Sequence, residues 1–156
     1  SIWQQVTGAG LNGLPPQVDL ANEERLAAEL TASEAAGITA AHDLSEGGLG
    51  QSLAEMCFDG GVGAQVDLSA VHADATTALF SESASRILVA TNDVEATLAA
   101  AKQAGVPAAE IGATTEERTI KVAEGVSVGV DELREVWAAT LPGLFGNATG
   151  ANSVLD

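Results

Sequence analysis

The sequence predicts an α+β fold in which helices pack on a mixed or antiparallel sheet. Helical and strand-like segments alternate over the first part of the chain, and a β-rich stretch then precedes a closing helix. The chain has 156 residues, 46% of them apolar, which is enough for one core and too little for two domains. We therefore expect one compact domain.

The first 20 residues are predicted to be a connector rather than the first element of the fold. Gly8, Gly10, Gly13 and the Pro15-Pro16 pair interrupt any regular pattern there. We expect the folded domain to cover residues 21–145. Residues 146–156 are small and polar, and we expect a flexible tail.

Caps and hydrophobic spacing locate the elements of the predicted domain. A helix over residues 22–36 has acids in its first turn and Gly37 as its stop signal. Ser45 is predicted to cap a helix that buries Leu49, Leu53, Met56 and Cys57 and ends at Gly60 and Gly61. The last helix is predicted to start at Asp131, to bury Leu133, Val136, Trp137 and Leu141, and to stop at Pro142 and Gly143. The other expected elements are strands over 38–43, 62–68, 85–91, 108–114, 119–123 and 126–130, and helices over 74–80 and 93–104.

The charge of the chain excludes several classes of partner. Six Lys and Arg residues face 22 Asp and Glu residues, so the formal net charge is −16, which repels phosphate backbones and anionic lipids. We expect no nucleic-acid partner and no membrane partner, and we expect a cytoplasmic location. Cys57, the single cysteine, has no partner for an internal disulfide, and the two histidines supply none of the usual zinc-ligand pairs.

The first candidate site is the segment AHDLSEGGL, residues 41–49. The amides of Gly47 and Gly48 at a helix start could receive a phosphate, with Asp43 and Glu46 holding Mg²⁺ beside it. The alternative is structural: Ser45 is only a helix cap and the glycines allow close packing against a neighbour.

His42 is a candidate acid or base, because it lies next to Asp43 at a strand end. His42 is expected to be packed and hydrogen-bonded, because adjacent strand residues point to opposite faces and it cannot easily form an orienting pair with Asp43. His72 is expected at the surface.

The second candidate site is LFSESASR, residues 79–86. Ser81 and Ser83 flank Glu82, and these groups could bind a polar ligand together with Arg86. In the alternative interpretation the serines cap the break between helix and strand, and Glu82 forms a surface ion pair with Arg86. Cys57 shares a helical face with leucines and is expected to be a buried apolar residue.

AHDLSEGGLGQSLAEM, followed some thirty residues later by LFSESASRILVA, resembles the C-terminal domain of the AIR synthase-related family, and within it the phosphoribosylformylglycinamidine synthases. The opening SIWQQVTG and the run from Pro15 to Leu20 are similar to the connector before that domain. The resemblance implies a fold like the AIR synthase C-terminal domain and a missing upstream ATP-binding domain. The HDLSEGGL form resembles the second of the two copies of this domain in these enzymes.

The activity implied by the resemblance is the ATP-dependent amidation of formylglycinamide ribonucleotide, with ATP and Mg as cofactors of the full-length enzyme and none assured in this chain. The implied partners are the upstream domain, a glutaminase subunit and a small subunit. From both arguments together, we expect the residues that bind substrate or nucleotide to be Asp43, Ser45, Gly47, Gly48, Glu82 and Ser83. Ala84 replaces the glutamine of the family's Glu-Ser-Gln segment, which puts direct substrate binding in doubt.

No catalytic residue is expected in this chain, because the family's main ATP and magnesium ligands lie in the upstream domains. We expect the chain to be inactive alone and to self-associate through the face that the upstream domain would cover. Two alternatives stay open: a non-catalytic scaffold that binds partner subunits or a structural nucleotide, and a domain of aminoimidazole ribonucleotide synthetase.

Overall fold

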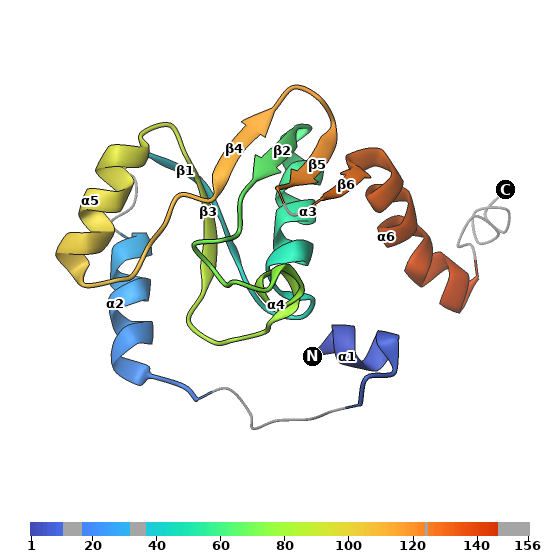
Figure 1. Ribbon diagram of the computed structural model, residues 1–156, viewed down its shortest axis with the longest axis horizontal. Coiled ribbons are helices and arrows are strands. Elements are labelled where there is room, and N and C mark those ends of the chain that lie inside the picture. The colour runs from blue at the N-terminus through green and yellow to red at the C-terminus, as the bar shows by residue number, and fades with distance from the viewer. Residues whose placement is uncertain (11–16, 32–36, 124, 147–156) are drawn as a thin grey trace, which may run out of the picture.

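The computed structural model describes residues 1–10, 17–31, 37–123 and 125–146. The first two described elements are helices, and strands and helices then alternate up to the three short strands that precede the last helix (Figure 1). The helices are α1 (Ile2–Thr7), α2 (Leu20–Thr31), α3 (Gly48–Gly60), α4 (Ala75–Phe80), α5 (Val94–Ala104) and α6 (Val130–Phe145). The strands are β1 (Ile38–Asp43), β2 (Gly63–Val66), β3 (Ile87–Thr91), β4 (Gly112–Thr115), β5 (Thr119–Val122) and β6 (Val126–Gly129).

The described strands form two sheets. β1 and β3 make an antiparallel ribbon with Asp43 opposite Ile87, and the second sheet has the order β4-β2-β5-β6. In that second sheet β2 pairs parallel with β5, and the other two pairings are antiparallel. The α+β class with mixed and antiparallel pairing is therefore confirmed.

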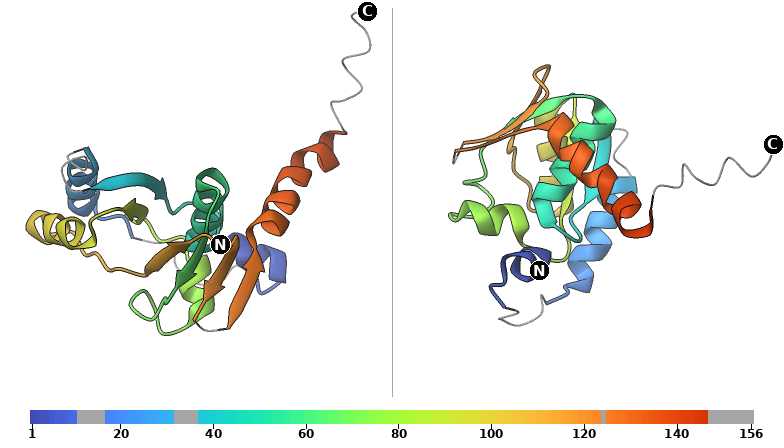
Figure 2. Two further views of the ribbon diagram at one scale, coloured as in Figure 1. Left: turned by 90° about the horizontal axis from the view of Figure 1, so that it is seen from above. Right: turned by 90° about the vertical axis from the view of Figure 1, so that its right-hand side faces the viewer.

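The core lies between α3 and the four-stranded sheet. Leu49, Leu53 and Cys57 of α3 are buried at the predicted positions, and Leu68 and Val130 are fully buried at 0% exposure. From above, α2 and α5 lie side by side at the end of the β1–β3 ribbon away from α3 (Figure 2, left). The β1–β3 ribbon thus connects α3 with the α2–α5 pair.

Several element boundaries differ from the sequence predictions. The first 20 residues contain α1, whose capping box is formed by Ser1 and Gln4 and which ends at Gly8 with φ 68°. α2 starts at Leu20, and residues 32–36 of the predicted helix, like 147–156 of the predicted tail, lie outside the described residues. Residues 108–111 are not a strand, because β4 begins at Gly112.

The prediction for the last helix was wrong in its end and in its burial. α6 continues through Pro142 and Gly143 to Phe145. Pro142 lies in the last turn, where its missing N–H removes one backbone hydrogen bond at the end of the helix. Only the first part of α6 packs on α3, and the rest runs away from it (Figures 1 and 2).

Apolar side chains of α6 that were predicted to be buried are exposed instead: Val136 by 68%, Trp137 by 55% and Leu141 by 65%. Leu144 and Phe145 extend this exposed apolar series to the end of the helix. Across the described ranges, every helix is too short or too polar to cross a membrane.

Candidate functional site

The glycine turn, residues 45–48, joins the end of β1 to α3. Gly47 is the N-cap of α3 with φ 82°, Gly48 has φ 63°, and no side chain caps the helix. The prediction that Ser45 caps α3 was therefore wrong: the Ser45 carbonyl accepts a hydrogen bond from the Gly48 amide at 3.1 Å, and the residue is exposed. Two consecutive left-handed residues bring the chain into the helix, a conformation that favours glycine.

The glycine turn packs directly on the end of α4. A Cβ atom at Gly48 would lie 2.7 Å from the Ser81 carbonyl oxygen and 2.8 Å from that of Leu79. At Gly50 it would lie 3.2 Å from the Phe80 ring. Close packing against a neighbour, one of the two sequence interpretations of these glycines, is confirmed.

Glu82 turns toward the glycine turn rather than toward Arg86. Its Oε1 accepts hydrogen bonds from the Gly47 amide at 3.1 Å and from the Ile2 amide at 2.8 Å. The expected ion pair with Arg86 is wrong, since the Arg86 guanidinium donates to the carbonyl (3.3 Å) and the hydroxyl (2.9 Å) of Ser81. Burial lowers the pKa of Arg86.

The two candidate segments therefore share one edge of the molecule. Asp43 ends β1 opposite the start of β3, and the Leu44 amide donates to the Arg86 carbonyl at 3.1 Å. The Asp43 carboxylate is 72% exposed. Ser83 is exposed as well. Polar side chains at this edge thus face outward, while Gly47 and Glu82 hold it together.

A hollow of about 970 Å³ lies beside this edge, between the β1–β3 ribbon, α5 and β4. Its walls are mainly apolar and include Leu53, Leu88, Leu98 and Ile111. None of the six predicted ligand-binding residues lines it. These residues form an open edge rather than an enclosed pocket.

His42 forms a cluster that the sequence did not reveal. Its Nδ1 lies 2.8 Å from the Asp43 carbonyl oxygen and its Nε2 lies 2.8 Å from Glu55 Oε2. The Glu55 Oε1 atom accepts from Gln51 Nε2 at 2.7 Å and from the Trp137 indole N–H at 3.1 Å. The cluster therefore joins β1, α3 and α6.

Both ring nitrogens of His42 face oxygen acceptors, and only the imidazolium form carries a proton on each of them. The backbone hydrogen bond to Asp43 is the main cause that raises the pKa of His42; burial opposes it, and Glu55 and the Asp43 carboxylate raise the pKa further. The prediction of a packed, hydrogen-bonded histidine is confirmed. The prediction that His42 and Asp43 cannot easily pair was wrong. The Asp43 carbonyl oxygen lies 2.8 Å from Nδ1 and orients the ring, and the Asp43 carboxylate Oδ1 lies within ion-pair distance of the same nitrogen at 3.6 Å.

The Gln51–Glu55 contact follows from their spacing of four residues on one helix. The hydrogen bond from Trp137 to Glu55 depends on the packing of α6 against α3, and a local sequence pattern does not show that packing.

Metal ligands do not gather in the part of the chain that the structure describes, where no group of three or more His, Cys, Asp and Glu side chains could hold an ion. Asp43 and Glu46, the two carboxylates considered for Mg²⁺, are both exposed. Cys57 is buried, and burial raises the pKa of its thiol. His72 is exposed, as expected.

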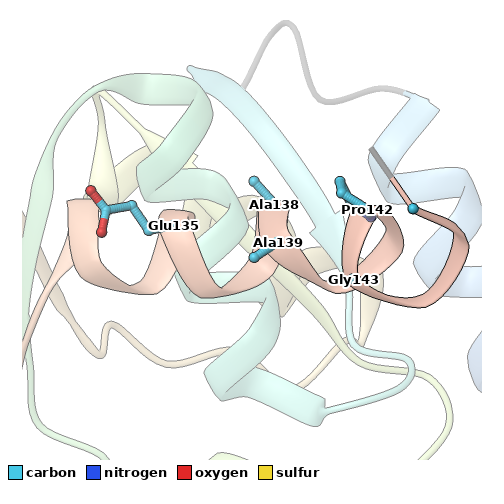
Figure 3. Close-up of a pocket in the computed structure, with 6 residues that line it drawn as sticks. Glu135, Ala138, Ala139, Pro142 and Gly143 are labelled. Atoms are coloured by element: carbon cyan, nitrogen blue, oxygen red, sulfur yellow. The ribbon is translucent and has the colours of Figure 1, made fainter. Parts of the chain in front are cut away.

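A depression along α6 is lined by Glu135, Ala138, Ala139, Pro142, Gly143 and Gly146 (Figure 3). Its labelled side chains come from one helix and include a single charged group. This lining offers no converging set of polar groups for a ligand.

The sequence of the chain is similar to that of one described protein family. Residues 1–124 match the family model described as "AIR synthase related protein, C-terminal domain". The chain is 56% identical, over its whole length, to the phosphoribosylformylglycinamidine synthase subunit PurL of Corynebacterium aurimucosum, of which it covers 21%. It is 52% identical to the Corynebacterium glutamicum subunit of the same name, with 99% of the chain and 20% of the relative covered. The chain thus spans about a fifth of the length of these relatives.

Solved structures of Thermotoga maritima PurL share the fold. The complex with ATP has a TM-score of 0.68 at 22% identity and matches 77% of this chain and 23% of that one. The complex with FGAR has a TM-score of 0.64 at 24% identity, with 71% and 20% covered. The structure titled PurLQS has a TM-score of 0.65 at 25% identity, with 72% and 21% covered.

Proposed function

Because the chain belongs to the family of AIR synthase related proteins, as their C-terminal domain, we propose that it forms part of a phosphoribosylformylglycinamidine synthase. The relative that is 56% identical over the whole chain carries this name, and this identity is the observation that supports the proposal most strongly. In this account the chain is the last domain of an ATP-dependent ligase, in which it is the second copy of its kind.

The proposed reaction converts formylglycinamide ribonucleotide, ATP and ammonia to formylglycinamidine ribonucleotide, ADP and phosphate. ATP phosphorylates the amide oxygen of the substrate, and ammonia then displaces phosphate at the same carbon. The Thermotoga maritima complexes with ATP and with FGAR support both ligands for the full-length enzyme.

We place the ATP and its magnesium in an upstream domain rather than in this chain. The described residues gather no metal-binding set. The Gly47 amide is bonded to Glu82 and the Gly48 amide to the Ser45 carbonyl, so neither is free for a phosphate oxygen. The chain alone is then expected to have no ligase activity, and its own role is to complete and position the site.

The candidate site is proposed to consist of Asp43, Ser45, Gly47, Gly48, Glu82 and Ser83, some of which face the ligand and some of which position the others. Asp43, Ser45 and Ser83 are exposed and point their polar groups away from the core. Gly47, Gly48 and Glu82 fix the backbone that carries them. A split site of this kind needs a second wall, which the upstream domain would supply.

The proposed partners are that upstream domain, a glutaminase subunit that supplies ammonia, and a small subunit. The PurLQS structure supports an assembly of PurL with other subunits. The exposed apolar end of α6, formed by Leu141, Leu144 and Phe145, is a candidate contact surface, and it would also promote self-association of the separate chain. We place the enzyme in the cytoplasm.

The alternative functions differ in what the chain binds. A scaffold would bind partner subunits without nucleotide, whereas a retained auxiliary site would bind Mg-ADP in a way that depends on Asp43. A domain of aminoimidazole ribonucleotide synthetase would instead support the cyclisation of formylglycinamidine ribonucleotide.

The proposal is tested by assaying the full-length protein that contains this chain. With formylglycinamide ribonucleotide, Mg-ATP and ammonium, we expect ADP and the amidine product in equal amounts, and neither from residues 1–156 alone. Cyclase activity of the full-length protein without amidation would contradict the assignment, and turnover by the chain alone would contradict the split site.

A further inference from the structure

We propose that Glu82 is a built-in anion that closes the glycine turn and fastens α1 to it, so that this turn is a joint between two segments rather than a phosphate receptor. One carboxylate oxygen, Oε1, accepts the amides of both Gly47 and Ile2. These two donors are 45 residues apart in the sequence and come from different helices. The inference does not depend on which reaction the enzyme catalyses.

The Glu82 carboxylate fills the place that a phosphate oxygen would take. Amides at a helix start bind anions because their N–H groups lack partners within the helix. Here the Gly47 amide donates to Glu82 at 3.1 Å, and the Gly48 amide donates to the Ser45 carbonyl at 3.1 Å. To bind the Gly47 amide, a phosphate would have to displace the Glu82 carboxylate. The hydrogen bonds that the phosphate forms would then replace hydrogen bonds that Glu82 loses.

Charge works against such a displacement. A phosphate beside an ionised Glu82 meets a like charge in a chain of net charge −16. Arg86, the cation of the same segment, donates to Ser81 and is not directed at this carboxylate. The local charges therefore favour the internal anion over an external one.

The same segment holds α1 by a second contact. The Trp3 ring stacks on Phe80 with centroids 6.4 Å apart and planes inclined by 18°. Phe80 also lies against Gly50 in the first turn of α3. Phe80 and Glu82 thus each touch α1 on one side and the start of α3 on the other.

This arrangement couples the residues before the domain to the candidate site. If α1 moves away, Glu82 loses the hydrogen bond from the Ile2 amide. The Glu82 carboxylate is then held less firmly in the position in which it accepts the Gly47 amide. Glu82 is therefore a positioning residue: it acts on the site through the glycine turn rather than by touching a ligand.

The test follows backbone amide signals of the 156-residue chain by ¹H–¹⁵N NMR while inorganic phosphate, and separately Mg-ADP, is added to millimolar concentration. We expect the Gly47 and Ile2 amide signals of the unmodified chain to stay in place. In Glu82→Ala both signals should move together, and the Trp3 indole N–H signal should shift toward its solvent-exposed position.

Glu82→Gln retains an oxygen acceptor and should restore all three signals close to their original positions, even if the Ala variant proves too unstable to measure. Glu110→Gln, an exposed carboxylate far from α1 in sequence, is the matched control and should move none of them. A saturable shift of Gly47 with phosphate or Mg-ADP in the unmodified chain would overturn the proposal. So would a Glu82→Ala or Glu82→Gln variant in which Gly47 moves and Ile2 does not.

Discussion

Gly48 is a position at which the fold leaves no room for a side chain. Its φ is 63°, and an added Cβ would meet two backbone carbonyl oxygens, those of Ser81 and Leu79, at 2.7 and 2.8 Å. Backbone atoms of a neighbouring segment cannot rotate away as the end of a flexible side chain can. Gly48→Ala must therefore separate the glycine turn from the end of α4.

Two costs add in this variant. A left-handed backbone costs a residue other than glycine about 1 to 2 kcal/mol. Overpacking of a close contact costs about 1 to 3 kcal/mol. We expect Gly48→Ala to lower the free energy of unfolding by about 2 to 5 kcal/mol, a large share of the roughly 5 to 15 kcal/mol typical of a domain.

Gly105→Ala is the matched control. Gly105 caps α5 with a similar φ of 72°, but an added Cβ would meet only the Arg25 side chain, at 3.9 Å. Its expected cost is the backbone share alone, about 1 to 2 kcal/mol. Urea unfolding followed by circular dichroism measures both variants, and equal losses would refute the close approach of the two segments.

Three further predictions concern other parts of the molecule. The pKa of His42 is raised in the folded state, so the stability that His42 contributes should be present at pH values below its unfolded-state pKa and lost as the pH rises through its folded-state pKa. His42→Gln should remove this pH dependence of the urea midpoint. A pH dependence that stays the same in His42→Gln would exclude His42 as its source. Trp137→Phe removes the indole N–H that donates to Glu55 and should cost about 0.5 to 1.5 kcal/mol, whereas the exposed Leu144→Ala should be close to neutral in the same urea titration. The buried Cys57 thiol should react with a thiol reagent only as fast as the chain unfolds, and rapid labelling of the native chain would show that the core packed against α3 does not cover it.

Local signals predicted much of the fold. β1 was predicted with both of its ends, and the helix predicted over 93–104 is α5, whose N-cap is Asp93 and whose C-cap is Gly105. These elements are specified by residues next to one another in the sequence. On the apolar face predicted for α3, Leu49, Leu53 and Cys57 are buried, whereas Met56 is only half-buried.

The failures involve contacts between distant segments. Ser45 has the residue type of a cap, but the approach of residues 79–81 selects the two glycines and makes Gly47 the cap. Glu82 and Arg86 have the spacing of an ion pair, yet Glu82 binds amides that are 35 and 80 residues away. Such partners leave no local pattern in a sequence.

The last helix failed for a different reason. Its apolar spacing is typical of a buried face, and the sequence shows the spacing without showing what covers it. Trp137 keeps two partners on α3, the Phe58 ring at 6.0 Å and Glu55 Oε1 at 3.1 Å, while Leu141 is 65% exposed. The helical period of an amphipathic helix can therefore be predicted from the sequence, while the surface that covers its apolar face cannot.

The exchange rate of the Gly47 amide hydrogen with solvent tests most directly whether the candidate site is assembled through Glu82. In the unmodified chain we expect slow exchange at both Gly47 and Ile2, and in Glu82→Ala faster exchange at both, with the middle of α3 unaffected. Rapid exchange of Gly47 in the unmodified chain would contradict the account, because it would mean that the two segments are not joined in solution.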